Sequence, residues 1–237
     1  MPSAVIAFPV HPRKVMQADY RPALLCGYDE KIEHLASTGV DYCISLDFSR
    51  EMSAMSAYDF MHDVLKKQLM VDTLLIGYDH RFGHNRTDGF EEYKRYGQEM
   101  GIEVLQAKEF EGEHVSSSWI RRLLSEGDVC KASQLLTYNY TISGKIVEGF
   151  KVGRTIGFPT ANIQVWERYK VIPAFGVYAV YAHVDGNRYE AMLYIGKRPT
   201  LHNGDNISIE VNLIDFDGDL YNKELTAEFI KFIRPDE

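Results

Sequence analysis

Gly149-Phe-Lys-Val-Gly153-Arg154-Thr-Ile-Gly157-Phe-Pro-Thr160-Ala-Asn162 is the stretch that decides how the second half of this chain folds. Its three glycines, four residues apart, let the backbone turn tightly and approach an anion, and Arg154 offers a guanidinium suited to phosphate. Thr160 and Asn162 alternate, so on an extended strand both side chains face one side, where their oxygens can hold a hard cation and its phosphate. No Gly-Lys-Ser/Thr follows, which excludes a Walker A loop. On spacing alone, an ordinary glycine-rich hairpin loop is the simpler interpretation.

The pattern of apolar and turn residues changes near residue 136. After residue 136, β-rich runs separated by turn residues predict an antiparallel sheet or barrel. These runs are residues 140–147, 176–183, 188–195 and 208–213. Before residue 136, short apolar runs alternate with segments of helical period, which predicts a parallel sheet flanked by helices. We therefore expect two abutting domains, residues 1–136 and 137–237.

The elements expected in the first domain follow from local signals. Strands are predicted at residues 5–8, 42–46, 73–77 and 103–106, and helices at 29–37 and 56–69. A further helix is predicted to open at Asp88, with Glu91 completing a capping box, and to stop at Gly101. Two more helices are expected near Trp119 and from Asp128 to residue 136.

Composition bounds the function. The 237 residues are 45% hydrophobic and 12% aromatic, which excludes a disordered or fibrous chain. The net charge of −8 has no block of like charges, so nucleic acid is not expected as a partner. Three cysteines without a C-x-x-C pair argue against disulfides and zinc. Without a membrane span or signal peptide, the expected compartment is the reducing cytoplasm.

The Gly149–Asn162 stretch closely resembles the signature of the riboflavin kinase (flavokinase) family, whose members fold as a six-stranded Greek-key barrel. Two further blocks resemble the family: Ile195-Gly-Lys197-Arg-Pro-Thr200, and Ile209-Glu210-Val-Asn-Leu-Ile-Asp215-Phe-Asp-Gly-Asp219-Leu-Tyr221. Lys197 stands where the family more often has a small residue, which we interpret as surface variation. The resemblance covers residue 136 to the end of the sequence.

The resemblance implies ATP-dependent phosphorylation of the riboflavin 5′-hydroxyl to give FMN. Thr160 and Asn162 would then bind Mg²⁺ and the nucleotide phosphates, and Glu210 would be the general base. Gly149, Gly153, Gly157 and Arg154 would hold phosphate, with Arg154 acting at the transferring group. These roles agree with phosphoryl transfer, which asks a protein mainly for positioning and charge neutralisation.

The first half resembles the FMN adenylyltransferase module of bacterial bifunctional FAD synthetases, a nucleotidyltransferase of Rossmann type. The resemblance lies in Gly77-Tyr-Asp79-His-Arg81-Phe82-Gly83, in Ser116-Ser117-Ser118-Trp-Ile-Arg121 and in His11-Pro12-Arg13. It implies that the segment beginning at His11, with Asp79 and Phe82, lies around the flavin. The serine run and Arg121 would offer hydroxyls, N–H groups and a cation to the triphosphate. An ordinary serine N-cap is the competing interpretation of this run.

One diagnostic element of that family is missing from the sequence. None of the eight histidines forms the His-x-Gly-His pair that the family uses to bind ATP phosphate. The final helix that usually packs on the barrel is also missing. We expect that these elements lie outside this sequence and that adenylylation by this chain is impaired.

Three functions are compatible with these motifs. The first is the two-step enzyme making FMN and FAD, with ATP and Mg²⁺ as co-substrate and cofactor. The second is a flavin- or nucleotide-binding regulatory protein without catalysis. A kinase with a degenerate first domain is a variant of the first function. The third is an α/β nucleotidyltransferase for another substrate, which the flavokinase half disfavours. The sequence leaves the oligomeric state open.

Overall fold

The structure is a computed structural model, and it describes residues 1–84, 86–109, 112, 114–147, 160–197 and 207–236. The chain forms two compact units. The first comprises Met1–Pro22 and Tyr28–His114, and the second comprises Ala23–Gly27 and Val115–Glu237. Each unit is described by itself below.

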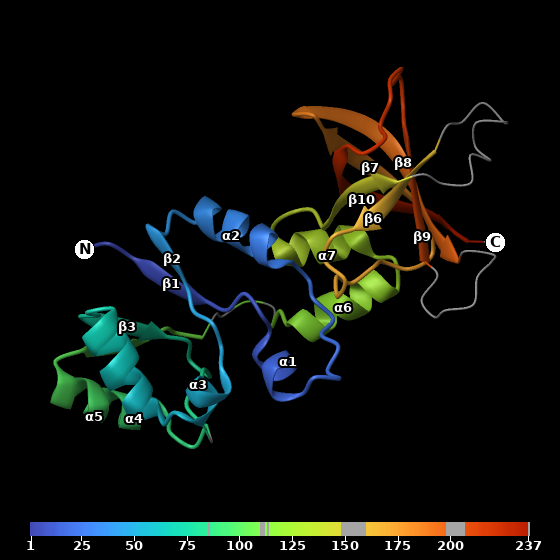
Figure 1. The fold of residues 1–237 in the computed structure, drawn as a ribbon. Coiled ribbons are helices and arrows are strands. Elements are labelled where there is room, and N and C mark those ends of the chain that lie inside the picture. The colour runs from blue at the N-terminus through green and yellow to red at the C-terminus, as the bar shows by residue number, and fades with distance from the viewer. Residues whose placement is uncertain (85, 110–111, 113, 148–159, 198–206, 237) are drawn as a thin grey trace. The chain divides into compact units, whose positions relative to one another are not determined.

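The first unit contains two pairs of parallel strands and several helices (Figure 1). Strand β1 pairs with β2, and β3 pairs with β4. The elements, in chain order, are β1 (Ala4–Ala7), α1 (Pro12–Met16), α2 (Tyr28–Ser37), β2 (Tyr42–Ser45), α3 (Arg50–Ala54), α4 (Ala57–Asp59), η1 (Phe60–Gln68), β3 (Thr73–Ile76), α5 (Phe90–Met100) and β4 (Glu103–Gln106). Each of the four strands lies within one residue of its predicted bounds, because short apolar runs between turn residues favour strands.

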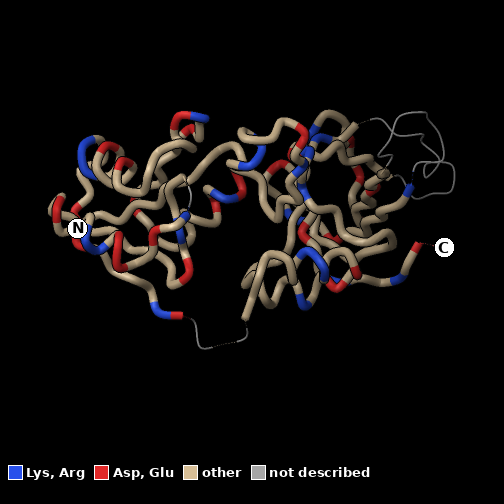
Figure 2. Tube along the Cα trace, turned by 90° about the horizontal axis from the view of Figure 1, so that it is seen from below, with Lys and Arg blue, Asp and Glu red and all other residues tan. Residues whose placement is uncertain are grey.

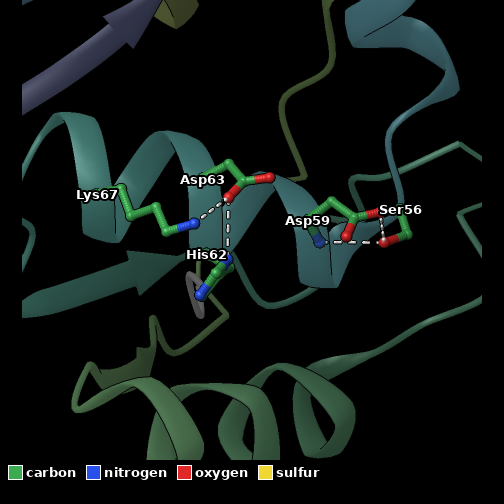
Figure 3. Close-up of polar contacts among 5 residues, drawn as sticks. All are labelled: Ser56, Asp59, His62, Asp63 and Lys67. Atoms are coloured by element: carbon green, nitrogen blue, oxygen red, sulfur yellow. Dashed lines mark hydrogen bonds and ion pairs between the residues drawn. The ribbon is translucent and has the colours of Figure 1, made fainter.

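The helix predicted over residues 56–69 is present, but most of it is a π-helix. Ser56 caps α4, since its Oγ accepts a hydrogen bond from the Asp59 amide at 3.0 Å. Helix η1 then continues to Gln68, and the Leu69 amide donates to the Val64 carbonyl, five residues back. Figure 3 shows the polar face of this helix, where the Asp63 carboxylate contacts His62 at 3.0 Å and Lys67 at 3.1 Å.

The capping box of α5 lies one residue later than predicted. The Glu92 carboxylate, not that of Glu91, accepts the hydrogen bond from the amide of Gly89 at 2.9 Å. The helix therefore begins at Phe90, and it ends at Gly101, whose φ of 69° is left-handed. Asp88 does not cap the helix, because its carbonyl accepts a hydrogen bond from the buried hydroxyl of Tyr93 at 2.9 Å.

The second unit is built around a closed antiparallel barrel of six described strands, ordered β10-β5-β6-β9-β8-β7. The strands are β5 (Thr141–Val147), β6 (Ala161–Val165), β7 (Gly176–Val184), β8 (Asn187–Lys197), β9 (Ile207–Leu213) and β10 (Glu224–Pro235). Strand β7 alternates strictly between buried and half-buried residues, as a strand with one face toward the barrel interior must. The predicted barrel is confirmed.

Helices α6 (Ser117–Ser125) and α7 (Val129–Leu136) pack with the barrel in this unit (Figure 1). Leu124 and Val129 are fully buried in the same apolar cluster as the barrel residue Phe229. The Ala174 amide also donates to the Leu124 carbonyl at 2.9 Å. Both helices end by residue 136, before the β-rich part of the sequence begins. Their apolar faces nevertheless pack against the barrel.

Charged residues of both signs are interspersed along the chain (Figure 2). The acidic excess is therefore not gathered into one segment of the sequence. Across the described ranges, no helix combines the length and the hydropathy needed to cross a membrane.

Candidate active site

Strands β6 and β9 bring together residues that are distant in the sequence. Asn162 lies directly opposite Glu210 in the antiparallel register, and Thr160 immediately precedes β6. The hydroxyl of Thr160 donates to Glu210 Oε2 at 3.0 Å, across 50 residues of sequence. Since Ile163 and Val211 point into the barrel core, the alternating Asn162 and Glu210 lie on the opposite face of the sheet. The structure thus brings together the three predicted kinase residues that it describes.

Ser208 joins this set, and the sequence analysis missed it. Its Oγ lies 3.0 Å from Glu210 Oε1 and 3.2 Å from Asn162 Oδ1. Ser208 is 6% exposed and Asn162 is 7% exposed, so both polar groups are buried. The signal was present in the sequence, because a residue two positions before Glu210 shares its strand face.

An open pocket lies beside Thr160 and spans about 650 Å³ of space, part of which is open solvent. One wall comes from the ends of β5 and β6, including Val147. The other comes from the connection between β9 and β10, including Phe216, Asp219 and Tyr221. Asp219 Oδ1 accepts the amide of Tyr221 at 2.9 Å and so fixes this wall. The pocket combines aromatic and polar groups, as sites for small molecules do.

Tyr194 borders Glu210 on the other side, because the two residues are paired between β8 and β9. Its hydroxyl donates to Asp236 Oδ1 at 2.9 Å. Desolvation, the Asp236 carboxylate and the charge of Glu210 all raise the pKa of Tyr194. The ring lies over Gly196, where a β-carbon would come within 2.0 Å of the tyrosine oxygen. Tyr194 therefore remains a neutral donor at the edge of the site.

The other predicted phosphate-binding residues of the kinase half lie outside the described residues. These are Gly149, Gly153, Arg154 and Gly157. The same holds for Arg198, Pro199 and Thr200 of the second motif.

In the first unit, the predicted flavin-side segment follows β1. His11 caps the short helix α1, and its Nδ1 accepts the amide of Arg13 at 3.2 Å. The ring of Tyr20 lies 5.3 Å from the His11 ring and 5.9 Å from the Arg13 guanidinium carbon. Pro12 occupies the first position of α1, where its missing N–H costs nothing. The segment is thus a small aromatic and cationic cluster.

Asp79 and Phe82 follow β3, at its carboxyl end, where α/β sheets place ligands. Phe82 stacks on Tyr93 with ring centroids 4.3 Å apart. The Tyr93 hydroxyl accepts the amide of Phe82 at 3.0 Å, and burial raises the pKa of this phenol. Phe82 is therefore held by both its ring and its backbone.

The serine run opens α6 in the second unit. Ser116 is the N-cap, and its Oγ accepts the amide of Trp119 at 3.2 Å, so its own side chain serves the helix. Ser117 and Ser118 are exposed in the first turn. The Nε of Arg121 donates to the carbonyl of Ala23 at 2.7 Å, which ties residues 23–27 to this helix.

Oxygen atoms dominate the Thr160–Glu210 site. Within the described parts of the chain, no three His, Cys, Asp or Glu side chains cluster as metal ligands. A hydroxyl, an amide oxygen and one carboxylate nevertheless match the oxygen chemistry of a hard divalent cation, which completes its shell with phosphate and water. The donor set fits a metal that arrives with a nucleotide.

Two family models match different parts of the chain. A family model described as riboflavin kinase matches residues 136–237, and one described as FAD synthetase matches residues 1–119. The bifunctional riboflavin kinase/FMN adenylyltransferase of Escherichia coli K12 is 36% identical over 240 residues, covering 100% of this chain and 76% of the relative. The Listeria monocytogenes enzyme of the same name is 34% identical, covering 99% of this chain and 74% of the relative.

A crystal structure from Streptococcus pneumoniae, described as a macrolide-efflux protein, is also similar. It superposes with a TM-score of 0.87 at 29% identity, covering 100% of this chain and 77% of that one. The fold and the site together define an α/β nucleotidyltransferase-like unit and a flavokinase barrel. The chain belongs to the family of bifunctional riboflavin kinase/FMN adenylyltransferases.

Proposed function

We propose that this chain acts in FAD biosynthesis, phosphorylating riboflavin to FMN with ATP and, through its first half, transferring an adenylyl group to FMN. The family matches supply the two activities in the expected order. The observation that carries the kinase assignment is the hydrogen-bonded set of Thr160, Asn162, Ser208 and Glu210. The small molecules bound are then riboflavin, FMN and ATP.

In the kinase step, Glu210 is the general base. Its carboxylate accepts the proton of the riboflavin 5′-hydroxyl as that oxygen attacks the γ-phosphorus, and the bond to the β–γ bridging oxygen breaks to release ADP. Thr160 donates to Glu210, so the lone pairs of its oxygen are left for a cation. Arg154 and the glycines at 149, 153 and 157 are proposed to hold the phosphates.

The cation is proposed to be Mg²⁺, held by Thr160 and Asn162 and by the nucleotide phosphates. Two neutral oxygens beside a single carboxylate suit Mg²⁺, which keeps several waters and binds mainly through phosphate. When bound, the metal would neutralise charge on the transferring phosphoryl group.

The pocket beside Thr160 is proposed to take the nucleoside part of ATP. Its position supports this assignment, because Thr160 lines the pocket and also bonds the proposed base. The ring of Phe216 would offer a surface on which a nucleobase stacks.

For the adenylyl step, we propose that the segment starting at His11, together with Asp79 and Phe82, contacts the flavin. The cluster of His11, Pro12 and Arg13 with Tyr20 supports this role, as does the fixed backbone of Phe82. Ser117, Ser118 and the terminal nitrogens of Arg121 are proposed to meet the triphosphate, and Ser116 supports them as the cap of the helix.

The test incubates the purified 237-residue chain with riboflavin, ATP and Mg²⁺ and separates riboflavin, FMN and FAD by chromatography. We expect FMN, and we expect Glu210→Gln to lower its rate at least about a hundredfold, as loss of a general base does. Glu190→Gln, an exposed carboxylate on β8, is the matched control and should leave the rate unchanged.

Each outcome decides a separate part of the proposal. FMN formation by Glu210→Gln at the wild-type rate would refute the general-base assignment. Absence of FMN with the wild-type chain would favour a flavin-binding protein without catalysis. FAD in the product mixture would demonstrate the second activity in this chain, contrary to the impairment expected from its sequence.

A further inference from the structure

Ser208 is a buried hydroxyl between two acceptors of the proposed kinase site. Its Oγ is 3.0 Å from Glu210 Oε1 and 3.2 Å from Asn162 Oδ1. A serine hydroxyl carries one hydrogen, so it can make a full hydrogen bond to only one of these oxygens at a time, or a weaker bond shared between both. Ser208 is 6% exposed and Asn162 is 7% exposed, so water has little access to the Asn162 oxygen when the hydroxyl turns to Glu210. The Ser208 hydroxyl can therefore donate its hydrogen mainly to Asn162 or mainly to Glu210.

A cation bound at Asn162 would direct the hydrogen of Ser208 to Glu210. Binding through the amide oxygen requires Oδ1 to face the cation, and a half-turn of the amide then presents Nδ2–H to Ser208. Ser208 would accept this hydrogen bond and donate its own hydrogen to Glu210. A hydrogen bond to a charged carboxylate is about twice as strong as one between neutral groups, so the chain Asn162 → Ser208 → Glu210 has one favoured direction.

We propose that Ser208 is a positioning residue that couples the amide of Asn162 to the carboxylate of Glu210, so that cation binding fixes the base. This inference rests on the proposed kinase function. Ser208 touches neither the cation nor the transferred phosphoryl group in this scheme. It acts by holding one oxygen of Glu210 while Thr160 holds the other.

The experiment compares Ser208→Ala with Ser143→Ala. Ser143 is a matched control, because its hydroxyl also makes a cross-strand bond, to Thr226 Oγ1 at 2.8 Å, on the barrel but away from the site. The first measurement is the rate of FMN formation at saturating Mg²⁺. The second is the binding of ADP by calorimetry, with and without Mg²⁺, which does not depend on turnover.

For Ser208→Ala we expect kcat to fall about tenfold, with the KM for riboflavin within about twofold of wild type, because the lost bond is to a charged group. The tightening of ADP binding by Mg²⁺ should weaken by roughly threefold or more, while ADP affinity without Mg²⁺ stays unchanged. In a Glu210→Gln background, the further loss on removing Ser208 should be below about twofold, because interacting residues are not additive. Ser143→Ala should match wild type in each measurement.

Retention of both kcat and the Mg²⁺ effect by Ser208→Ala would overturn the proposal, and so would a full tenfold loss in the Glu210→Gln background. If Ser208→Ala unfolds, Ser208→Cys keeps the volume with a much weaker donor and is judged by the same two measurements. A wild-type chain that makes no FMN would refute the kinase function instead. The ADP titrations would still decide whether Ser208 couples to the cation.

Discussion

Gly144, in the middle of β5, is a position at which the barrel has no room for an added methyl group. A β-carbon there would lie 2.4 Å from the carbonyl oxygen of Gln164 and 2.7 Å from Cγ2 of Ile163, both on β6. The obstructing oxygen belongs to backbone, so a side-chain rotation does not relieve the contact. Strand β6 must move away until the distance between the new β-carbon and the Gln164 oxygen reaches at least 3.0 Å, a shift of about 0.6 Å.

Gly144→Ala should therefore lower the free energy of unfolding of the barrel by about 2 kcal/mol. Overpacking costs about 1–3 kcal/mol, and here the cost should lie near 3 kcal/mol because the obstructing atom belongs to backbone. Alanine returns about 0.5–1 kcal/mol by restricting the unfolded chain, which leaves a net loss of about 2 kcal/mol. Both tryptophans, Trp119 and Trp166, lie in the second unit, so their fluorescence during urea unfolding reports on this unit. With a slope near 2 kcal/mol per molar urea, the midpoint should fall by about 1 M.

Gly144→Ala should also slow FMN formation in the folded protein by roughly tenfold or more, because β6 carries Asn162 and small misplacements are costly in catalysis. Gly186→Ala is the control: its φ is 76° and a β-carbon there meets nothing within 4 Å. It should cost about 1 kcal/mol of stability from backbone strain and leave the rate unchanged. An unaltered urea midpoint and rate for Gly144→Ala would refute the reasoning.

Two further predictions concern the half-buried carboxylate of Glu228 and the buried hydroxyl of Tyr93. Burial by itself raises the pKa of Glu228, but hydrogen bonds from Asn139 and His183 outweigh it and the net pKa is lowered from 4.5. The carboxylate thus stabilises the fold above pH 4.5 and stops doing so as the pH falls through the lower folded-state pKa. Glu228→Gln should cost about 1–2 kcal/mol at pH 7 in urea unfolding, and a difference from wild type that persists at pH 2 would contradict this. Tyr93→Phe should lose the bond to the Phe82 amide, destabilise the first unit by about 1–3 kcal/mol and weaken FMN binding in fluorescence titrations; unchanged FMN affinity would argue against Phe82 as a flavin contact.

Most elements of this fold could be predicted from local sequence signals. The four strands of the first unit follow from short apolar runs, and the β-rich runs after residue 136 correspond to β5, β7, β8 and β9. Asp128 was predicted to open a helix and does so, since its Oδ1 accepts the amide of Lys131 at 2.9 Å. Such signals succeed because they act between residues a few positions apart.

Other features depended on partners that are distant in the sequence. The one-residue shift of the α5 cap reflects the hydrogen bond between the Tyr93 hydroxyl and the Asp88 carbonyl. The π-helical form of residues 60–68 was not predicted either, and no local signal in the sequence indicated it. Strand β10 was not predicted as a separate run, although it closes the barrel between β5 and β7. Buried positions alternate regularly in β10 only as far as Phe229, and two register shifts, after Phe229 and after Phe232, break the alternation in the rest of the strand.

The sequence by itself supplied the groups of the proposed kinase site and the two family motifs in order: Thr160 and Asn162 as proposed oxygen ligands, and Glu210 as the proposed base. Only the tertiary structure decided how these groups meet. Closure of the barrel places β6 beside β9 and sets Asn162 opposite Glu210, and this register puts the hydroxyl of Ser208 between them. A one-residue slip would turn these side chains to the other face, so long-range strand pairing, which no local pattern encodes, fixes the site.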